Sequence, residues 1–292
     1  MSFSAFNDRA WNDHADDAAG VAQRLADALP LVTDETQLNQ LMTLAHHVHG
    51  EHLGRWHDGI ALIERLAALP VFVEGGASGQ ARRRWVASLR LSDASAVSTP
   101  GLDSLSPSDR IRVGAMAAAN LAERDTARAD RLLRAALDLA QRADLPATDP
   151  MHRALAVTGN NLTCTLESKP ARSADERALM ILAAQTARQH WAIAGTWLET
   201  ERAEYRLAMT WLQAGDPERA REHAQACLEI VEANQGAALE RFFGWEALGR
   251  VERAAGNPAG HAHALASARE AFAGLDEGDR GWCGESLEKL AG

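Results

Sequence analysis

The chain has little of what builds a sheet or a disulfide framework. Its 292 residues include three cysteines, nine prolines and one tyrosine, and runs of β-branched residues are nearly absent. Val71-Phe72-Val73 is the one strand-like triplet, and three residues are too few to carry a sheet. The cysteines are widely spaced and form no CxxC pair, which argues against a thiolate zinc site and a disulfide framework. We therefore expect an all-α protein with reduced cysteines.

A positive net charge and long apolar runs are absent as well. The formal charge at pH 7 is −10, which disfavours binding to a nucleic-acid backbone. Arg82-Arg83-Arg84 is the one basic run, and we interpret it as a solvated helix face. No apolar stretch approaches the roughly 20 residues that cross a bilayer, and the first twelve residues do not resemble a signal peptide. These features predict a cytoplasmic protein that binds neither nucleic acid nor a membrane.

Two segments near the C-terminus, 211–220 and 245–259, are built alike. In each, a helical stretch ends at a glycine, either Gly215 or Gly256. Asp or Asn then caps the next helix, and proline takes its first position. The two glycines lie 41 residues apart, an interval typical of stacked helical hairpins.

Similar signals predict about 12 to 14 helices in a single domain over 1–292. A helix capped by Asp34 is expected to run to about Leu53. The segment 71–106 is less regular: we expect one helix over 80–91, followed by a loop at 92–106 that is long for a compact domain. A terminal helix at about 280–291 is expected to cap the stack.

The two C-terminal segments resemble the tetratricopeptide repeat family. Trp245, Leu248 and Gly249 match the first-helix pattern of that family in order, although Glu252 stands where an aromatic residue is expected. The preceding unit adds four matches, namely Leu207, Ala208, Trp211 and Ala220. The resemblance implies a right-handed superhelical solenoid of antiparallel helix hairpins, in which the first helix of each hairpin lines a concave face.

The resemblance also implies a binding groove on that face, about one helical turn from the small packing residues. The implied groove residues are Arg153, Asn160, Thr163, Arg202, Tyr205, Met209, Phe243, Glu246, Arg250 and Arg253. Four arginines suit a carboxylate, such as a peptide C-terminus or an acidic segment. Pairing of these arginines with neighbouring glutamates is the alternative interpretation. We therefore expect a non-enzymatic adaptor that binds a protein or peptide segment and needs no cofactor; the alternative is a regulatory protein that senses a ligand or peptide.

Histidines cluster in one short part of the chain, at His46, His47, His49, His52 and His57. His49 and His52 are three residues apart and would share a face of a regular helix, so they are the candidate metal ligands. His47 stands at a helix-packing position and is expected to be buried and hydrogen-bonded. The segment 47–52 matches neither zinc-protease helix motif. A metal-dependent enzyme, such as a hydrolase, using the His46–His57 cluster is the second alternative function.

Overall fold

The computed structural model describes residues 1–95 and 101–292, and these residues are all-α. They contain fourteen α-helices and no strand, and consecutive helices pack against each other. The predicted fold class is therefore confirmed at this level. The helices fall into two compact units, Met1–Met151 and His152–Gly292, which are described separately. The superhelical arrangement and the single domain over 1–292 stay predictions.

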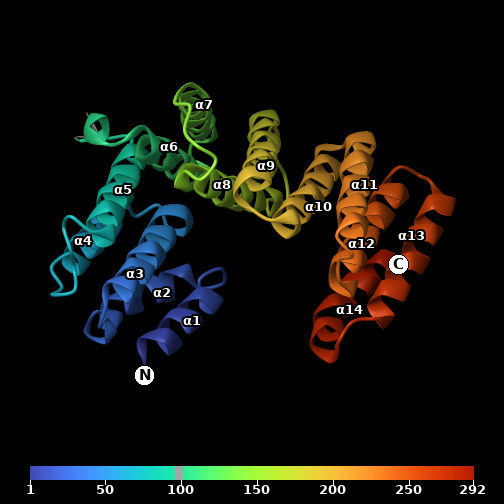
Figure 1. Ribbon diagram of the computed structural model, residues 1–292, viewed down its shortest axis with the longest axis horizontal. Helices are drawn as coiled ribbons and strands as arrows, with labels where there is room; N and C mark the ends of the chain where they lie inside the picture. Colours follow the sequence, from blue (N-terminus) through green and yellow to red (C-terminus); the bar gives the residue numbers. More distant parts are fainter. Residues whose placement is uncertain (96–100) are drawn as a thin grey trace. The chain divides into compact units, whose positions relative to one another are not determined.

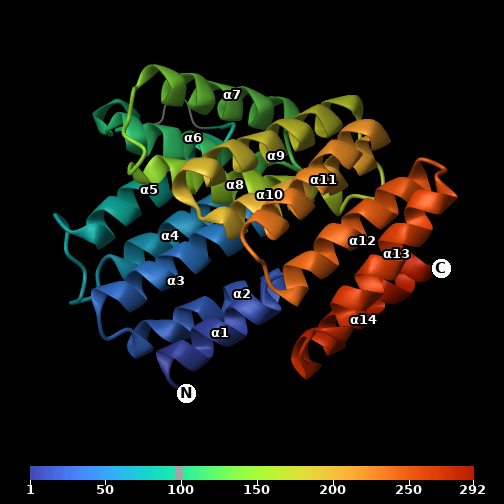
Figure 2. The same cartoon turned by 45° about the vertical axis from the view of Figure 1, so that its right-hand side comes forward.

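The first unit is built around α3. Figure 1 shows its helices in blue to green, and Figure 2 shows α3, α4 and α5 side by side. Its elements in chain order are α1 (Phe3–Asp13), α2 (Ala18–Arg24), the 3-10 helix η1 (Leu25–Leu31), α3 (Glu35–His47), the π-helical turn η2 (Val48–His52), α4 (Trp56–Leu66), α5 (Ala77–Ser92), the 3-10 helix η3 (Leu102–Ser104), α6 (Pro107–Leu121) and α7 (Thr126–Arg142).

The buried face of α3 forms the centre of this unit. Leu38, Leu41 and Met42 follow the helical period on one side of α3 and are fully buried. They pack in one cluster with Ile63 of α4 and Leu89 of α5. Burial of side chains of this size stabilises the fold by roughly 1.5–3 kcal/mol each, so α3 is fixed in place and can hold residues at its end.

The end of α3 differs from the sequence expectation. Asp34 caps its first turn as predicted, because the Asp34 carboxylate accepts a 2.8 Å hydrogen bond from the Gln37 amide. The regular helix ends at His47, however, and the backbone continues as the π turn. The Leu53 amide donates to the Val48 carbonyl at 3.0 Å, which is the i→i+5 bond of that turn. The expected α-helix to Leu53 is therefore wrong over its last six residues, 48–53.

The segment 71–106 contains a longer helix than expected. Helix α5 begins at Ala77 instead of residue 80, because Glu35 accepts hydrogen bonds from the Ser78 amide at 2.9 Å and the Ser78 hydroxyl at 2.7 Å. Of the expected loop at 92–106, residues 96–100 lie outside the described residues.

The second unit is a series of long helices, and Figure 2 shows α10 to α13 lying next to one another in chain order. Helix α8 (Pro150–Glu167) has its first two residues in the first unit and all its others in the second. The others are α9 (Ala174–Ala194), α10 (Trp197–Ala214), α11 (Pro217–Ala233), α12 (Ala238–Ala254), α13 (Pro258–Ala273) and α14 (Glu277–Ala291).

The predicted turns of the second unit are confirmed. Gly215 and Gly256 have φ values of 85° and 68°, a left-handed conformation that favours glycine after a helix. Asp216 and Asn257 then cap α11 and α13 with their side chains, and proline takes the first position of each helix. Each hairpin therefore reverses direction where the sequence predicts it.

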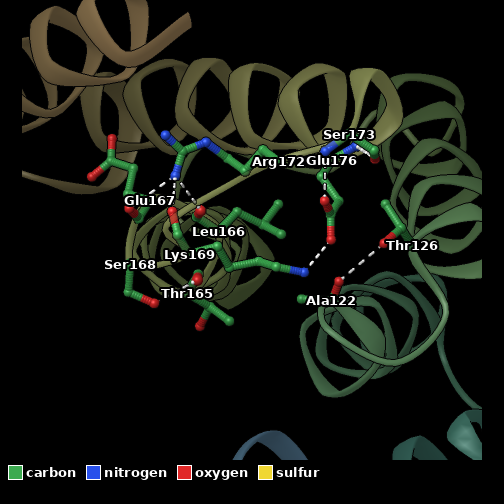
Figure 3. Close-up of polar contacts among 10 residues, drawn as sticks. All are labelled: Ala122, Thr126, Thr165, Leu166, Glu167, Ser168, Lys169, Arg172, Ser173 and Glu176. Atoms are coloured by element: carbon green, nitrogen blue, oxygen red, sulfur yellow. Dashed lines mark hydrogen bonds and ion pairs between the residues drawn. The ribbon is translucent and has the colours of Figure 1, made fainter.

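The turn between α8 and α9 is held by four side chains, shown in Figure 3. Arg172 donates to the carbonyls of Leu166, Glu167 and Lys169, which lie at the end of α8, at 2.9, 3.0 and 2.8 Å. Ser173 and Glu176 form a capping box at the start of α9, and Lys169 pairs with Glu176. Orphan carbonyls at the end of one helix and orphan amides at the start of the next are thereby satisfied.

Within residues 1–95 and 101–292, no helix is both long enough and apolar enough to cross a lipid bilayer.

Candidate functional site

The groove residues implied by the family resemblance lie on alternate helices of the second unit. Arg153, Asn160 and Thr163 belong to α8, while Arg202, Tyr205 and Met209 belong to α10. Helix α12 carries Phe243, Glu246, Arg250 and Arg253. Helices α10 and α12 contact each other directly, and we call the part of them that carries Arg202, Tyr205, Phe243, Glu246 and Arg250 the candidate face.

A buried carboxylate joins α10 and α12 at the centre of this face. The Tyr205 hydroxyl donates to Glu246 Oε2 at 3.0 Å, and Arg250 Nη1 donates to Glu246 Oε1 at 3.2 Å. Burial raises the pKa of Glu246, and it also raises the pKa of Tyr205. Each carboxylate oxygen of Glu246 thus has one donor, as expected for a polar group taken out of water.

Aromatic rings continue from this carboxylate to the surface. Tyr205 and Phe243 meet edge to face with their ring centroids 5.7 Å apart, and Phe243 lies 5.1 Å from Trp282 of α14. Trp282 is 65% exposed. Sequence reasoning missed Trp282, because α14 lies outside the repeat pattern and only the packing of α14 against α12 brings it to this face.

The four arginines of the expected groove have different surroundings. Arg202 is 62% exposed and lies 3.6 Å from Glu240, whereas the Arg250 side chain is 41% exposed. Arg153 stacks over the ring of Trp191 at 5.3 Å. Arg253 donates to the carbonyls of Lys289 and Leu290 at the end of α14. Arg202 and Arg250 are therefore the two whose partners are carboxylates of α12, and they lie on the helices that carry Tyr205 and Phe243.

Three of the other expected groove residues are less accessible. Met209 is buried and packs with Ala208, Ala224 and Ala247 between α10, α11 and α12. Thr163 is fully buried, and its hydroxyl donates to the Gly159 carbonyl at 2.8 Å. Asn160 is half-buried. The accessible part of the candidate site is thus smaller than the set implied by the resemblance.

A second candidate site lies in the first unit, where three histidines converge. One ring nitrogen from each of His14, His47 and His52 lies within 4.8 Å of those of the other two. His47 Nε2 and His52 Nε2 are 3.1 Å apart. Burial, helped by the neighbouring His47, lowers the pKa of His52 to about 4. The ring of His52 is therefore neutral at pH 7 and has one nitrogen lone pair.

The π turn explains why His47 and His52 meet. Five residues along a regular α-helix turn the side chain by about 140° from its starting direction, which would separate the two rings. The wider i→i+5 turn at Val48–His52 returns position 52 to the side of position 47.

The sequence pattern could not select this pair. It favoured His49 and His52 because it assumed an α-helical spacing, and it gave no reason to include His14. His49 is buried, and its Nδ1 has no hydrogen-bond partner among the described residues.

Apart from His47 and His52, the histidines of the sequence cluster lie outside this site. His46 is buried against Trp85, and its Nε2 lies 2.6 Å from the Ser88 hydroxyl. His57 is exposed and lies 3.6 Å from Asp93. His47, expected to be buried and hydrogen-bonded, is half-buried with Nδ1 3.1 Å from Glu51. The five-histidine pattern thus divides into one pair at the convergent site and three residues with other surroundings.

Comparison with known proteins adds no relative. No protein-family model, curated protein or solved structure matches the chain. The likeness to tetratricopeptide repeats therefore depends on the residue pattern, and the function has to be argued from the two sites.

Proposed function

We propose that the protein is a non-enzymatic adaptor of the tetratricopeptide-like type, a right-handed solenoid of helix hairpins that binds a protein or peptide segment. The observation that carries the proposal is the exposed Trp282 at the end of the Tyr205–Phe243–Trp282 row of rings, with Arg202 and Arg250 on the two helices that carry the first two rings. Tryptophan, tyrosine and arginine are the residues that most often dominate binding energy at protein interfaces.

The charges of this face favour a partner with a carboxylate. A guanidinium has five N–H donors, and the bond to Glu246 engages one nitrogen of Arg250. Arg202 lies 3.6 Å from Glu240, which is too long for a good hydrogen bond. Both guanidiniums therefore retain donors for a bidentate bond to a carboxylate. The Trp282 ring would cover an apolar side chain next to that carboxylate.

A peptide array tests this proposal. The full chain is applied to immobilised peptides that end either in a carboxylate or in an amide and that carry apolar or acidic residues nearby. We expect binding to peptides with a free carboxylate or an acidic run. The Arg202→Glu and Arg250→Glu variants should lose that binding by about tenfold or more, since a hydrogen bond to a charged group contributes roughly 1.5–3 kcal/mol. Trp282→Ala should weaken every peptide that binds.

Arg134→Glu is the matched control. Arg134 is 56% exposed and pairs with Asp130 on its own helix α7, so the change has the same charge difference at a similar exposure. Peptide binding should be unchanged in this variant. Unchanged binding in both Arg202→Glu and Arg250→Glu would refute the assignment of this face.

A further inference from the structure

We infer that His14, His47 and His52 form a binding site for one zinc-like divalent metal ion. The three residues come from three different places in the first unit: the residue after α1, the last residue of α3, and the last residue of the π turn. Neutral imidazoles are preferred ligands of Zn²⁺, and three of them with an open fourth position make a known type of zinc site. The inference is independent of the proposed peptide binding, which concerns the second unit.

Hydrogen bonds fix which nitrogen of two rings carries the proton. His14 Nδ1 lies 2.5 Å from the Trp11 carbonyl oxygen, which can only accept, so Nδ1 carries the proton. His47 Nδ1 faces the Glu51 carboxylate at 3.1 Å and donates in the same way. In the neutral form of each ring, Nε2 therefore carries the lone pair that a metal ion needs. A carboxylate or carbonyl behind a histidine is the usual outer partner of a metal ligand.

The spacing of the rings suits a tetrahedral ion. Zn–N bonds of about 2.0–2.1 Å place neighbouring ligand nitrogens roughly 3.3 Å apart. The observed 3.1 Å between His47 Nε2 and His52 Nε2 is close to that value. Without a metal, two neutral rings at this distance form an N–H···N hydrogen bond, in which one nitrogen is the donor and the other the acceptor. A bound metal ion would instead accept the lone pairs of both nitrogens. Small movements of these half-buried rings bring the nitrogen of His14 to about the same spacing from the other two.

The backbone that carries His52 is held rigidly. Arg124 of the α6–α7 turn donates to the carbonyls of Glu51 and His52 at 2.9 and 2.7 Å. Gly54 allows this approach, because its φ is +62° and a Cβ there would lie 2.3 Å from Arg124 Nε. The Arg124 side chain also lies over the Trp56 ring at 5.7 Å. A site whose ligands are fixed before the ion arrives loses little conformational entropy on binding.

Metal titration tests the inference. The full chain is produced without a histidine tag, stripped with a chelator and titrated with Zn²⁺ in competition with a chromophoric chelator. We expect one Zn²⁺ per chain. Co²⁺ should also bind and give the visible absorption of a tetrahedral site.

Variants assign the ligands. Glu51→Gln removes the carboxylate behind His47 and should weaken Zn²⁺ binding by about 10- to 100-fold, as losses of outer partners do. His14→Ala and His52→Ala should weaken it by more. His57→Ala is the control, because His57 is exposed and outside the cluster, and it should bind like the wild type. Far-UV circular dichroism checks that each variant is folded.

Two results would overturn the inference. One is a stoichiometry below about 0.1 Zn²⁺ per chain in the folded wild type at micromolar metal. The other is wild-type affinity in the folded Glu51→Gln, His14→Ala and His52→Ala variants, which would show that Zn²⁺ binds elsewhere.

Discussion

The close approach of α8 and α9 leads to a quantitative prediction at Gly159. A Cβ at this position would lie 2.7 Å from the Ala183 carbonyl oxygen and 3.1 Å from the Ala187 amide nitrogen. Both are backbone atoms of α9, so Gly159→Ala can be accommodated only if the two helices move apart. Overpacking of this kind costs about 1–3 kcal/mol. The higher helix propensity of alanine returns about 0.5–1 kcal/mol.

We therefore expect Gly159→Ala to lower the free energy of unfolding by about 1 kcal/mol, the middle of the roughly 0–2.5 kcal/mol that these two terms leave. Gly284 of α14 provides the matched control, because a Cβ there meets nothing within 4 Å. Gly284→Ala gains the propensity term without the clash and should raise the free energy of unfolding by about 0.5–1 kcal/mol. The same chemical change thus has opposite signs at two helical positions of one unit.

Urea denaturation followed by circular dichroism measures both values, and the slope of the transition checks that the denatured state is unchanged. In thermal unfolding, the two variants should move the midpoint in opposite directions, by a few degrees each. If both variants are stabilised to the same extent, the close approach at Gly159 is refuted.

Two further predictions concern buried charges in the second unit. Burial, with a contribution from His152, lowers the pKa of His190 to about 4, so the folded state binds fewer protons than the unfolded state between about pH 4 and 6.5. Stability should fall as the pH drops through that window, and between pH 7 and pH 5 the wild type should lose about 2 kcal/mol more than His190→Gln in urea denaturation. Arg206→Met leaves the 6%-exposed carboxylate of Glu167 without its 2.6 Å guanidinium partner. It should lower the free energy of unfolding by about 3 kcal/mol, whereas Arg202→Met at an exposed pair should change it by less than about 1 kcal/mol; equal losses in both would contradict the argument.

Local signals in the sequence predicted much of the fold. The predicted caps at Asp34, Asp216 and Asn257 are all present, and each side chain accepts a hydrogen bond from the amide three residues further along the chain. These features succeed because cap and helix start lie within one turn of the chain, where a single residue decides the backbone geometry.

Longer-range features were harder to predict. Residues 18–31 form α2 followed by a 3-10 helix that runs through Pro30, and α1 lies before them. His14 approaches His47 and His52 only because α1 packs against α3. Trp282 reaches Phe243 through α14 in the same manner. Neighbours of this kind depend on tertiary packing, which leaves no mark on the spacing of residues.

The π turn contains one residue more than an α-helical turn, and this changes the spacing at which two ligands on a helix can meet. Two side chains five positions apart act here as a pair four apart acts in an ordinary helix, so a search written for the usual interval passes over them. Removing one residue among 48–50 should restore the standard winding and still leave the two imidazoles neighbours. Metal affinity measured in such a shortened chain would separate the contribution of the two rings from that of the π turn, without exchanging either ligand.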